Sequence, residues 1–196
     1  MALDPHGLWT VDRALRELPP RAHWEIDEGR LVMREPAGPY HGVATTLVTV
    51  RLHAFVSSHS LGRVLSGEPG FYLARIPDTL RAPDVAFVST LRWQAITDPE
   101  RFAEIPPNLA VEVLSPSERP AAVRRKVAQY LALGVGSVWL IDPRRRTLEQ
   151  CLATGEVRVY GGEGDVVTDP TLPGFQCTFG ELLPPPIAGR TPTTPS

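Results

Sequence analysis

The chain has 196 residues, of which 42% are apolar and 21% charged, and this is ordinary usage for a globular protein rather than a disordered one. No apolar run reaches the roughly 18 residues of a membrane span, and the N-terminus lacks the basic and apolar regions of a signal peptide, which favours the cytoplasm and no membrane contact. The net charge of −2 excludes binding of nucleic acid through overall charge, and two cysteines, Cys151 and Cys177, are too few for a disulfide scaffold or a zinc cage.

The first half of the chain predicts two helices and several short strands. Apolar residues at helical spacing indicate a helix over residues 8–17 and a longer one over residues 40–60. Short strands are predicted around them: the two halves of a hairpin within residues 23–35, the segments RVLSG and GFYLARI around the loop 67–70, and DVAFV after a loop that contains Pro77 and Pro83.

The second half predicts a strand–helix–strand unit. Residues 89–107 are polar and rich in proline, so we expect a surface excursion there. LAVEVL is a strand, Ser117 is a candidate helix cap, and a helix over residues 118–133 ends at Gly134. VGSVWLID reads as a strand covered on both faces. Two strands joined in this way should be parallel, with a right-handed crossover.

The remaining segments complete the expected architecture. RRRTLEQCL and GEVRVYG form a hairpin, and FQCTFGELL closes the fold. The fold class is therefore α/β or α+β, with a mixed central β-sheet flanked by helices. We expect one domain over residues 1–183, since about 150 residues is a usual domain length. Residues 184–196 are rich in proline and have no apolar face, which predicts an extended or disordered tail.

Two acidic residues stand at the edges of apolar strands. Glu112 lies inside LAVEVL, where a buried carboxylate needs a partner or a metal, unless it is solvated at the strand end or paired with arginine. Asp84 opens DVAFV and, taken alone, is typical of a turn. Neighbouring strands lie about 4.8 Å apart, so these two carboxylates could share one divalent ion.

The basic residues of the chain single out Lys126. It is the only lysine among 20 basic residues, the other 19 being arginine. A guanidinium cannot replace a compact ammonium, so a lysine kept in such a chain suggests a specific role, although a solvated helix lysine is the alternative. Facing both carboxylates, it could orient a water or stabilise a phosphate. Asp84, Glu112 and Lys126 are therefore candidate catalytic residues for metal-assisted phosphodiester hydrolysis.

The surrounding blocks resemble a known family. PDVAFV, LAVEVLSPS, KVAQYLALGV and VWLIDP occur in this order, with WEIDEGRLVMREP and HG near the start and PGF near the end. They are similar to the Uma-two type family of restriction-endonuclease-like proteins, in the PD-(D/E)xK nuclease superfamily, over about residues 21–183. The resemblance implies a restriction-endonuclease-like core, motif acids at Asp84 and Glu112, the backbone carbonyl of Val113 as a further metal ligand, and Mg²⁺ or Mn²⁺ as the cofactor.

The sequence departs from the superfamily pattern at one position. Leu114 stands two residues after the acid, where the superfamily usually has its lysine. The resemblance places the lysine on the following helix, at Lys126, and the scarcity of lysine indicates the same residue independently. Tyr130, one helical turn later, matches the tyrosine of a looser Gln-x-x-x-Tyr motif, with lysine in place of glutamine.

Three residues are second-tier candidates, namely Tyr130, His41 and Glu68. His41 opens the second predicted helix and could face the site, or act only as a solvated or capping residue. Glu68 is a candidate third acid, although a turn residue is the more typical interpretation of its loop. Glu25 matches the opening block of the family without a role that the sequence indicates. Residues 144–146 are a basic run that could contact phosphates, but a solvated turn is more typical.

The leading hypothesis is an endonuclease that uses Mg²⁺ or Mn²⁺ to hydrolyse nucleic acid, with DNA the expected substrate. A homodimer would suit double-strand cleavage. A second hypothesis is a nucleic-acid-binding or regulatory module that keeps the fold but turns over poorly, because the negative charge and few basic runs do not suit tight duplex binding. A third is an interaction protein in which the three residues form a buried ion-pair network.

Overall fold

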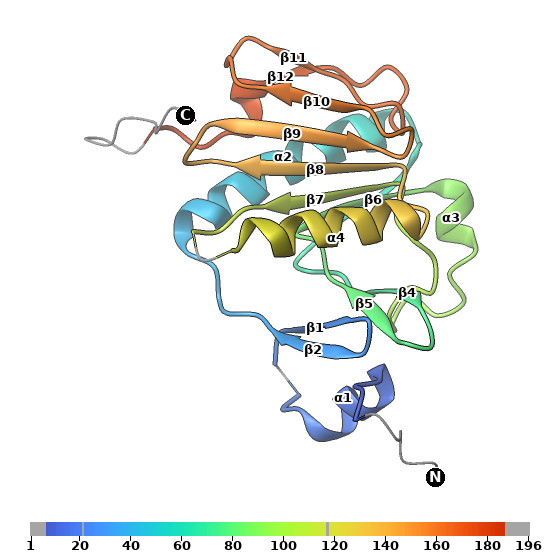
Figure 1. Cartoon of the computed structure of the whole chain (residues 1–196). Coiled ribbons are helices and arrows are strands. Elements are labelled where there is room, and N and C mark those ends of the chain that lie inside the picture. Colours follow the sequence, from blue (N-terminus) through green and yellow to red (C-terminus); the bar gives the residue numbers. More distant parts are fainter. Residues whose placement is uncertain (1–6, 21, 117, 187–196) are drawn as a thin grey trace.

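A six-stranded mixed sheet forms the centre of the computed structural model, which describes residues 7–20, 22–116 and 118–186 (Figure 1). Its strand order is β10-β9-β8-β7-β6-β3. β7 and β8 are parallel and every other neighbouring pair is antiparallel, so the predicted mixed sheet is confirmed. The strands are β3 (Gly62–Ser66), β6 (Val85–Ser89), β7 (Leu109–Val113), β8 (Ser137–Asp142), β9 (Thr147–Leu152) and β10 (Val157–Tyr160).

Two helices cover opposite faces of this sheet, α2 (Pro39–Ser58) behind it and α4 (Pro120–Ala132) in front of it in the view of Figure 1. Successive side chains of a strand point to opposite faces of the sheet, so those of β7 pack alternately on the side of α2 and on the side of α4. Val111 joins the core under α2, whose Val48, Leu52 and Val56 recur every fourth residue. Ala110 joins the core under α4.

Helix α4 supplies the predicted crossover between β7 and β8. Proline suits its first position because the missing N–H has no partner in the first helical turn, and Pro120 occupies that position. The helix stops where Gly134 adopts a φ of 97°, a left-handed conformation that glycine takes without strain. The helix begins two residues later than the sequence predicts, with Arg119 at the N-cap. The expected cap, Ser117, lies outside the described residues.

A smaller sheet, with the order β2-β1-β5-β4, lies below the central one in Figure 1. Helix α1 (Val11–Glu17) packs on it through a cluster that includes Val11 and Ile26. Its strands are β1 (Trp24–Asp27), β2 (Arg30–Met33), β4 (Phe71–Ala74) and β5 (Thr79–Arg81).

This smaller sheet confirms one sequence prediction and corrects another. The segments on either side of the loop 67–70 are strands, as predicted, with β3 in the central sheet and β4 in the smaller one. The stretch that contains Pro77 was expected to be a loop, whereas Thr79–Arg81 forms β5 between β1 and β4. A three-residue strand is too short to show an alternation in sequence.

The predicted surface excursion over residues 89–107 is correct only in part. It contains a short helix, α3 (Thr90–Gln94), whose N-cap Ser89 accepts a hydrogen bond from the backbone of Arg92. It also contains Ala103, which is buried and bridges to Phe71 of β4. This segment therefore covers part of the core as well as meeting solvent.

The chain closes with a two-stranded sheet of β11 (Val166–Val167) and β12 (Cys177–Thr178), followed by a 3₁₀ turn, η1 (Phe179–Leu182). The first residues of the proline-rich tail contact the body, because the carbonyls of Pro184 and Pro185 accept hydrogen bonds from Arg146 and Tyr40. Residues 187–196 lie outside the described part. None of the described helices is long and apolar enough to span a membrane.

Candidate active site

Asp84 and Glu112 lie side by side because β6 and β7 pair in antiparallel register. Val85, the first residue of β6, faces Val111, and Asp84 directly before it accepts a hydrogen bond from the backbone N–H of Val113, the residue after Glu112. Both side chains are buried, with 3% of Asp84 and 4% of Glu112 exposed. The sheet thus brings together the two acids that the sequence singles out, at the carboxyl end of β7.

Glu112 is a buried carboxylate with both oxygens engaged. One oxygen accepts a hydrogen bond from Lys126 at 2.7 Å and the other from the phenol of Tyr130 at 2.8 Å. Burial raises the pKa of Glu112 and the charge of Lys126 lowers it, while the charges of Asp84 and Glu25 raise it further, to about 7. The carboxyl group therefore changes between its protonated and its charged form near neutral pH.

Lys126 points into the protein from α4 and not toward solvent. Its Nζ lies 2.7 Å from a Glu112 oxygen and 2.8 Å from a Glu25 oxygen, and the residue is 7% exposed. Burial alone would lower the pKa of Lys126, but the charges of Glu112 and Glu25 outweigh it and raise that pKa, so the ammonium stays charged. The interpretation of the only lysine as a solvated helix residue is therefore wrong.

Asp84 connects to His41, at the start of α2. Asp84 Oδ2 accepts a hydrogen bond from the backbone N–H of Val113 at 2.7 Å and lies 3.3 Å from His41 Nε2. The hydrogen bond to Asp84 raises the pKa of His41; burial opposes this, and the Val113 backbone supports it. His41 therefore faces the site, and the alternative of a solvated or capping residue is wrong.

Two further basic residues, Arg81 and Arg34, belong to the site, although no sequence pattern indicates either of them. Arg81, on β5, donates to Glu25 at 3.0 Å and is 4% exposed. Burial would lower the pKa of Arg34, but the surrounding carboxylates, Glu25 and Glu112 foremost, outweigh it and raise that pKa. A strand with one solvated face exposes every second side chain. Glu25 and Ile26 are consecutive residues of β1, yet both are buried.

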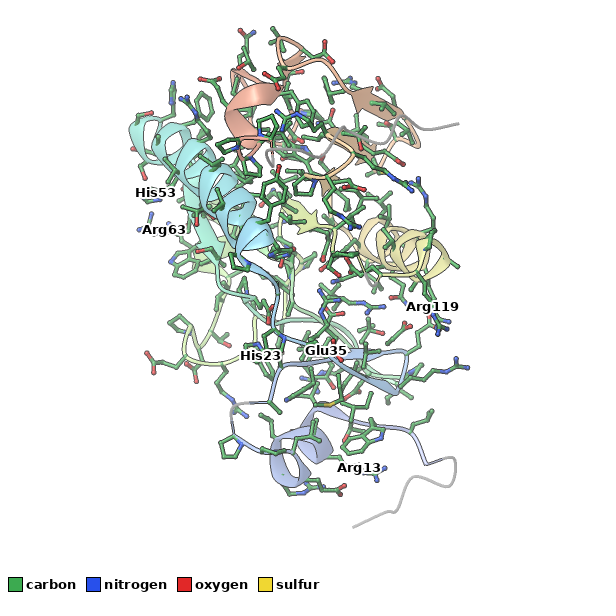
Figure 2. The ribbon with its side chains drawn as sticks, turned by 90° about the vertical axis from the view of Figure 1, so that its left-hand side faces the viewer. Arg13, His23, Glu35, His53, Arg63 and Arg119 are labelled. Atoms are coloured by element: carbon green, nitrogen blue, oxygen red, sulfur yellow. The ribbon has the colours of Figure 1, made fainter. Side chains whose placement is uncertain are left out.

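Glu68 and the other histidines of the described residues lie elsewhere. Glu68 pairs with His23 at 2.7 Å, both side chains partly exposed, and has a φ of 58° in its turn, which agrees with the interpretation as a turn residue. Figure 2 shows His53 on the outer side of α2, where the residue is exposed. His59 is likewise exposed.

Residues 12–180 match the Uma2 family, which is described as "Putative restriction endonuclease". The chain belongs to the Uma2 family. The fold resembles a crystal structure described as that of a "putative nuclease belonging to DUF820" from Anabaena variabilis, with a TM-score of 0.75 and 19% sequence identity, over 89% of this chain and 97% of that one. No curated protein matches the chain. The Uma2 match supports a nuclease, and the neighbour shows that the fold is shared.

The oxygen atoms of the site suit a hard divalent cation. Mg²⁺ in proteins is usually held by one or two carboxylates together with waters and substrate phosphates, and Asp84 and Glu112 provide two. The backbone of Val113 lies beside these carboxylates, where it hydrogen-bonds with His41. Among the described residues, no three His, Cys, Asp or Glu side chains form a ready-made metal site. Waters and phosphate oxygens would therefore complete the coordination.

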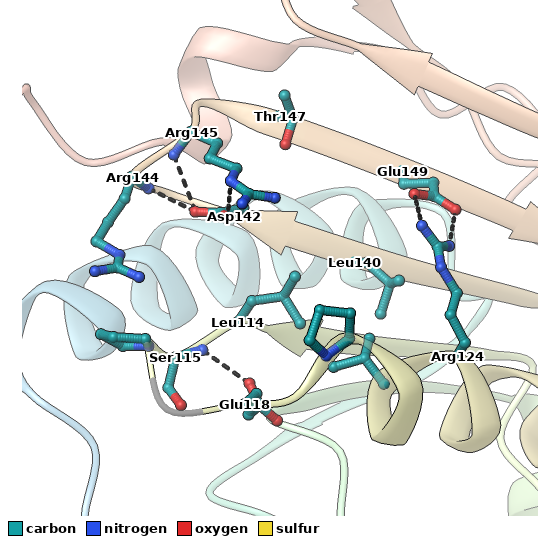
Figure 3. A pocket seen from close by; sticks show the side chains of 13 residues that line it. Leu114, Ser115, Glu118, Arg124, Leu140, Asp142, Arg144, Arg145, Thr147 and Glu149 are labelled. Carbon is teal, nitrogen blue, oxygen red and sulfur yellow. Dashed lines mark hydrogen bonds and ion pairs between the residues drawn. The ribbon is translucent and has the colours of Figure 1, made fainter. Parts of the chain in front are cut away.

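A pocket of about 230 Å³ opens beside the site, where the parallel strands β7 and β8 end (Figure 3). Leu114 and Ser115 line it directly after β7, and Asp142 lines it at the end of β8. Arg144 lies on its rim, and no ion pair within the described ranges engages this guanidinium. In open α/β sheets, ligands bind in the crevice outside the carboxyl ends of the strands.

Proposed function

We propose that this Uma2 chain is a divalent-metal-dependent endonuclease that hydrolyses phosphodiester bonds in DNA. The observation that carries the proposal is the placement of the only lysine, buried at 2.7 Å from Glu112, with Asp84 hydrogen-bonded to the backbone of the next residue, Val113. Two carboxylates with a fixed ammonium are the groups that metal-assisted phosphodiester hydrolysis requires. Membership of a family of restriction-endonuclease-like proteins supports the same chemistry.

In this proposal Asp84, Glu112 and the backbone carbonyl of Val113 hold Mg²⁺ or Mn²⁺, and His41 offers a nitrogen ligand beside them. When bound, the cation would lower the pKa of a water and balance the charge on the phosphate oxygens. Tyr130 holds one oxygen of Glu112 in place by donating its phenol hydrogen. Lys126 presents an ammonium that stabilises the negative charge that develops on the phosphate.

The pocket at the ends of β7 and β8 gives a nucleic-acid strand a path away from the metal ligands. It begins at Leu114, the residue after Val113, so a strand whose phosphate lies at the site can continue into it. Three acids line it, but Glu149 is paired with Arg124, Asp142 with Arg145, and Glu118 with Arg34. Arg144 is left to meet a phosphate, as a cation in this position can.

Cleavage of supercoiled plasmid, linear duplex and single-stranded DNA tests the proposal. We expect cleavage with Mg²⁺ or Mn²⁺ that EDTA abolishes and that is lost in Asp84→Asn. Asp98→Asn, on the exposed loop after α3, is a matched change of charge outside the site and should retain cleavage. Absence of cleavage on all three substrates with both ions, or equal cleavage by Asp84→Asn, would contradict the proposal. Light scattering on the same samples tests for the homodimer.

One observation favours the ion-pair network as a second candidate. Lys126 has carboxylate oxygens of Glu25 and Glu112 within 2.8 Å, and no buried side-chain polar atom in the described part lacks a hydrogen-bond partner. A ligand that binds only the native state stabilises it, so a metal site raises the melting temperature in Mg²⁺ or Mn²⁺ whereas a closed ion-pair network does not. Thermal melting with and without metal separates the two candidates.

A further inference from the structure

Glu25 is the second carboxylate that holds the only lysine. It lies on β1 of the smaller sheet and is 1% exposed. Its Oε1 accepts hydrogen bonds from Lys126 at 2.8 Å and from the backbone N–H of Ala82 at 3.0 Å, while its Oε2 accepts one from Arg81 at 3.0 Å. Both oxygens are therefore fixed by rigid neighbours.

The position of the ammonium depends on this carboxylate most strongly when a metal is present. A lysine carries its ammonium on a flexible four-carbon stem with three donors, so its place is set by what accepts from it. Glu112 and Glu25 accept two of these hydrogens. A divalent cation bound to Glu112 would compete with Lys126 for the oxygens of that carboxylate, and its positive charge would repel the ammonium. Glu25 is held independently of Glu112, by Arg81 and by the backbone N–H of Ala82.

We propose that Glu25 is a positioning residue, which fixes the ammonium of Lys126 at the place where the scissile phosphate arrives. This inference rests on the proposed function and extends it to the smaller sheet. β1 and β5 thereby become part of the site, since Glu25 comes from β1 and its partners Arg81 and Ala82 from β5 and the residue after it. The third hydrogen of the ammonium is left for the phosphate or the attacking water.

The chain offers a matched control for this role. Asp27 lies two residues after Glu25 and contacts Arg81 at 2.9 Å and Arg125 at 3.2 Å. It takes part in the same polar network but has no ion pair with Lys126 among the described residues. Asp27→Asn therefore perturbs the network as Glu25→Gln does while leaving the contact with the lysine intact.

The kinetic test compares initial rates of plasmid cleavage in Mn²⁺. We expect Glu25→Gln to lower kcat on the order of 10- to 100-fold, the usual effect of removing a group that orients another, with little change in KM. Asp27→Asn should stay close to wild type. Equal losses in the two variants, or a loss confined to KM, would overturn the positioning role.

A spectroscopic test does not depend on cleavage. Because Lys126 is the only lysine, lysine labelled with ¹³C at Cε gives a single side-chain signal in the full chain. An ordered ammonium should give a shifted resonance with restricted motion in wild type and in Asp27→Asn, and a mobile one in Glu25→Gln. An unchanged lysine signal in Glu25→Gln would overturn the inference, even if the wild-type protein cleaves DNA.

The same signal keeps the two proposals separable. If wild type shows no cleavage but the lysine is released in Glu25→Gln, the nuclease proposal fails and the contact with Glu25 still holds Lys126. Should Glu25→Gln not fold, Glu25→Asp keeps the charge opposite Arg81 and withdraws the carboxylate by one methylene. We expect Glu25→Asp to mobilise the lysine as well, and a rigid lysine in that variant would contradict the positioning role.

Discussion

Two buried carboxylates in this protein, Asp169 and Glu112, are held in opposite ways. Asp169 is 3% exposed and accepts five hydrogen bonds, all from neutral donors. They come from side chains on β8 and β9 and from a turn: Ser137, Trp139, Gln150 and the backbone and hydroxyl of Thr171. Glu112 is also buried but has only two donors, one of them the cation Lys126.

This difference separates a structural carboxylate from one that can bind a ligand. The acceptor capacity of Asp169 is filled by donors that stay in place, so it ties strands to a turn and leaves no direction open to a metal. Glu112 stands beside a second carboxylate, that of Asp84, and its pKa is raised to about 7. Burial alone does not distinguish the two, whereas the charge and number of their partners do.

The largest expected effect is on cleavage by Lys126→Arg. Glu112 and Glu25 hold a compact ammonium between them, whereas a planar guanidinium would pair with Glu112 and compete with the metal. We expect a loss of rate on the order of 10²–10³, as for other fixed charge-stabilising donors. A wider guanidinium at this position, where the lysine is 7% exposed, should also lower the melting temperature, so rates are compared at temperatures where the variant is folded.

Lys126→Ala, measured alongside, should lose at least as much rate. Wild-type rates in Lys126→Arg would mean that the lysine is not required for its ammonium, and the catalytic role would fall to the two acids alone.

Asp169→Asn should reverse this pattern, with a large effect on stability and none on metal affinity. An amide replaces an acceptor by a donor, so buried donors around it lose their partner at roughly 1–3 kcal/mol each. Urea unfolding measures the loss in the free energy of unfolding. Mn²⁺ affinity below the melting temperature should match wild type, and a loss of affinity without a loss of stability would erase the distinction drawn between the two carboxylates.

Much of the central sheet and of the site could be predicted from sequence. β7 and β8 read as continuous apolar runs, and Glu112 stood out because a charge interrupted one of them. Lys126 stood out because the chain has no other lysine. The acids are brought together by the pairing of β6 with β7, and the lysine by the α4 crossover, of which only the crossover follows from the strand–helix–strand pattern.

The β1–β2 hairpin of the smaller sheet was predicted, but the burial of its Glu25 side chain was not. Glu25 alternates with apolar residues in β1, a pattern that is typical of a strand with one solvated face. That face is instead covered by α4, and no local pattern reports contacts between residues about a hundred positions apart. Arg81 was missed for the same reason, since its strand has three residues and its partners Glu25 and Gln129 lie far away in sequence.

The pH dependence of metal binding should follow Glu112. A metal requires the carboxylate form, and this form is populated above a pKa of about 7. Affinity for Mn²⁺ should therefore fall about tenfold per pH unit below that value and level off above it. Proton release from His41, whose pKa is also raised, acts in the same direction. Calorimetry at pH values on both sides of 7 measures it, and a flat profile would contradict the raised pKa.

The raised pKa of Glu112 also predicts that, without metal, the free energy of unfolding falls as pH rises. Because the folded-state pKa of Glu112 is raised from 4.5 to about 7, its contribution to stability is complete below pH 4.5 and is lost as pH rises through 7. Added Mn²⁺ should offset the loss. Urea unfolding with and without Mn²⁺ across this range checks both halves of the prediction.

The smallest effect is expected at the pocket rim. Arg144→Ala removes one cation that can meet a phosphate, so DNA affinity should fall modestly and the salt dependence of binding should lose about one unit of slope. Arg158→Ala is the control, because that arginine, on β10, pairs with Glu156 and does not line the pocket. Equal salt slopes for wild type and Arg144→Ala would remove the pocket from the DNA path.

Calorimetric titration of Mn²⁺ into wild type, Asp84→Asn, Glu112→Gln and Asp169→Asn tests the central claim most directly. Each change keeps the shape of the side chain and removes one charged oxygen, which hard cations require of their ligands. We predict binding by wild type and Asp169→Asn, and none by Asp84→Asn or Glu112→Gln while both remain folded. Unchanged Mn²⁺ affinity in Asp84→Asn and Glu112→Gln would show that these carboxylates do not form a metal site.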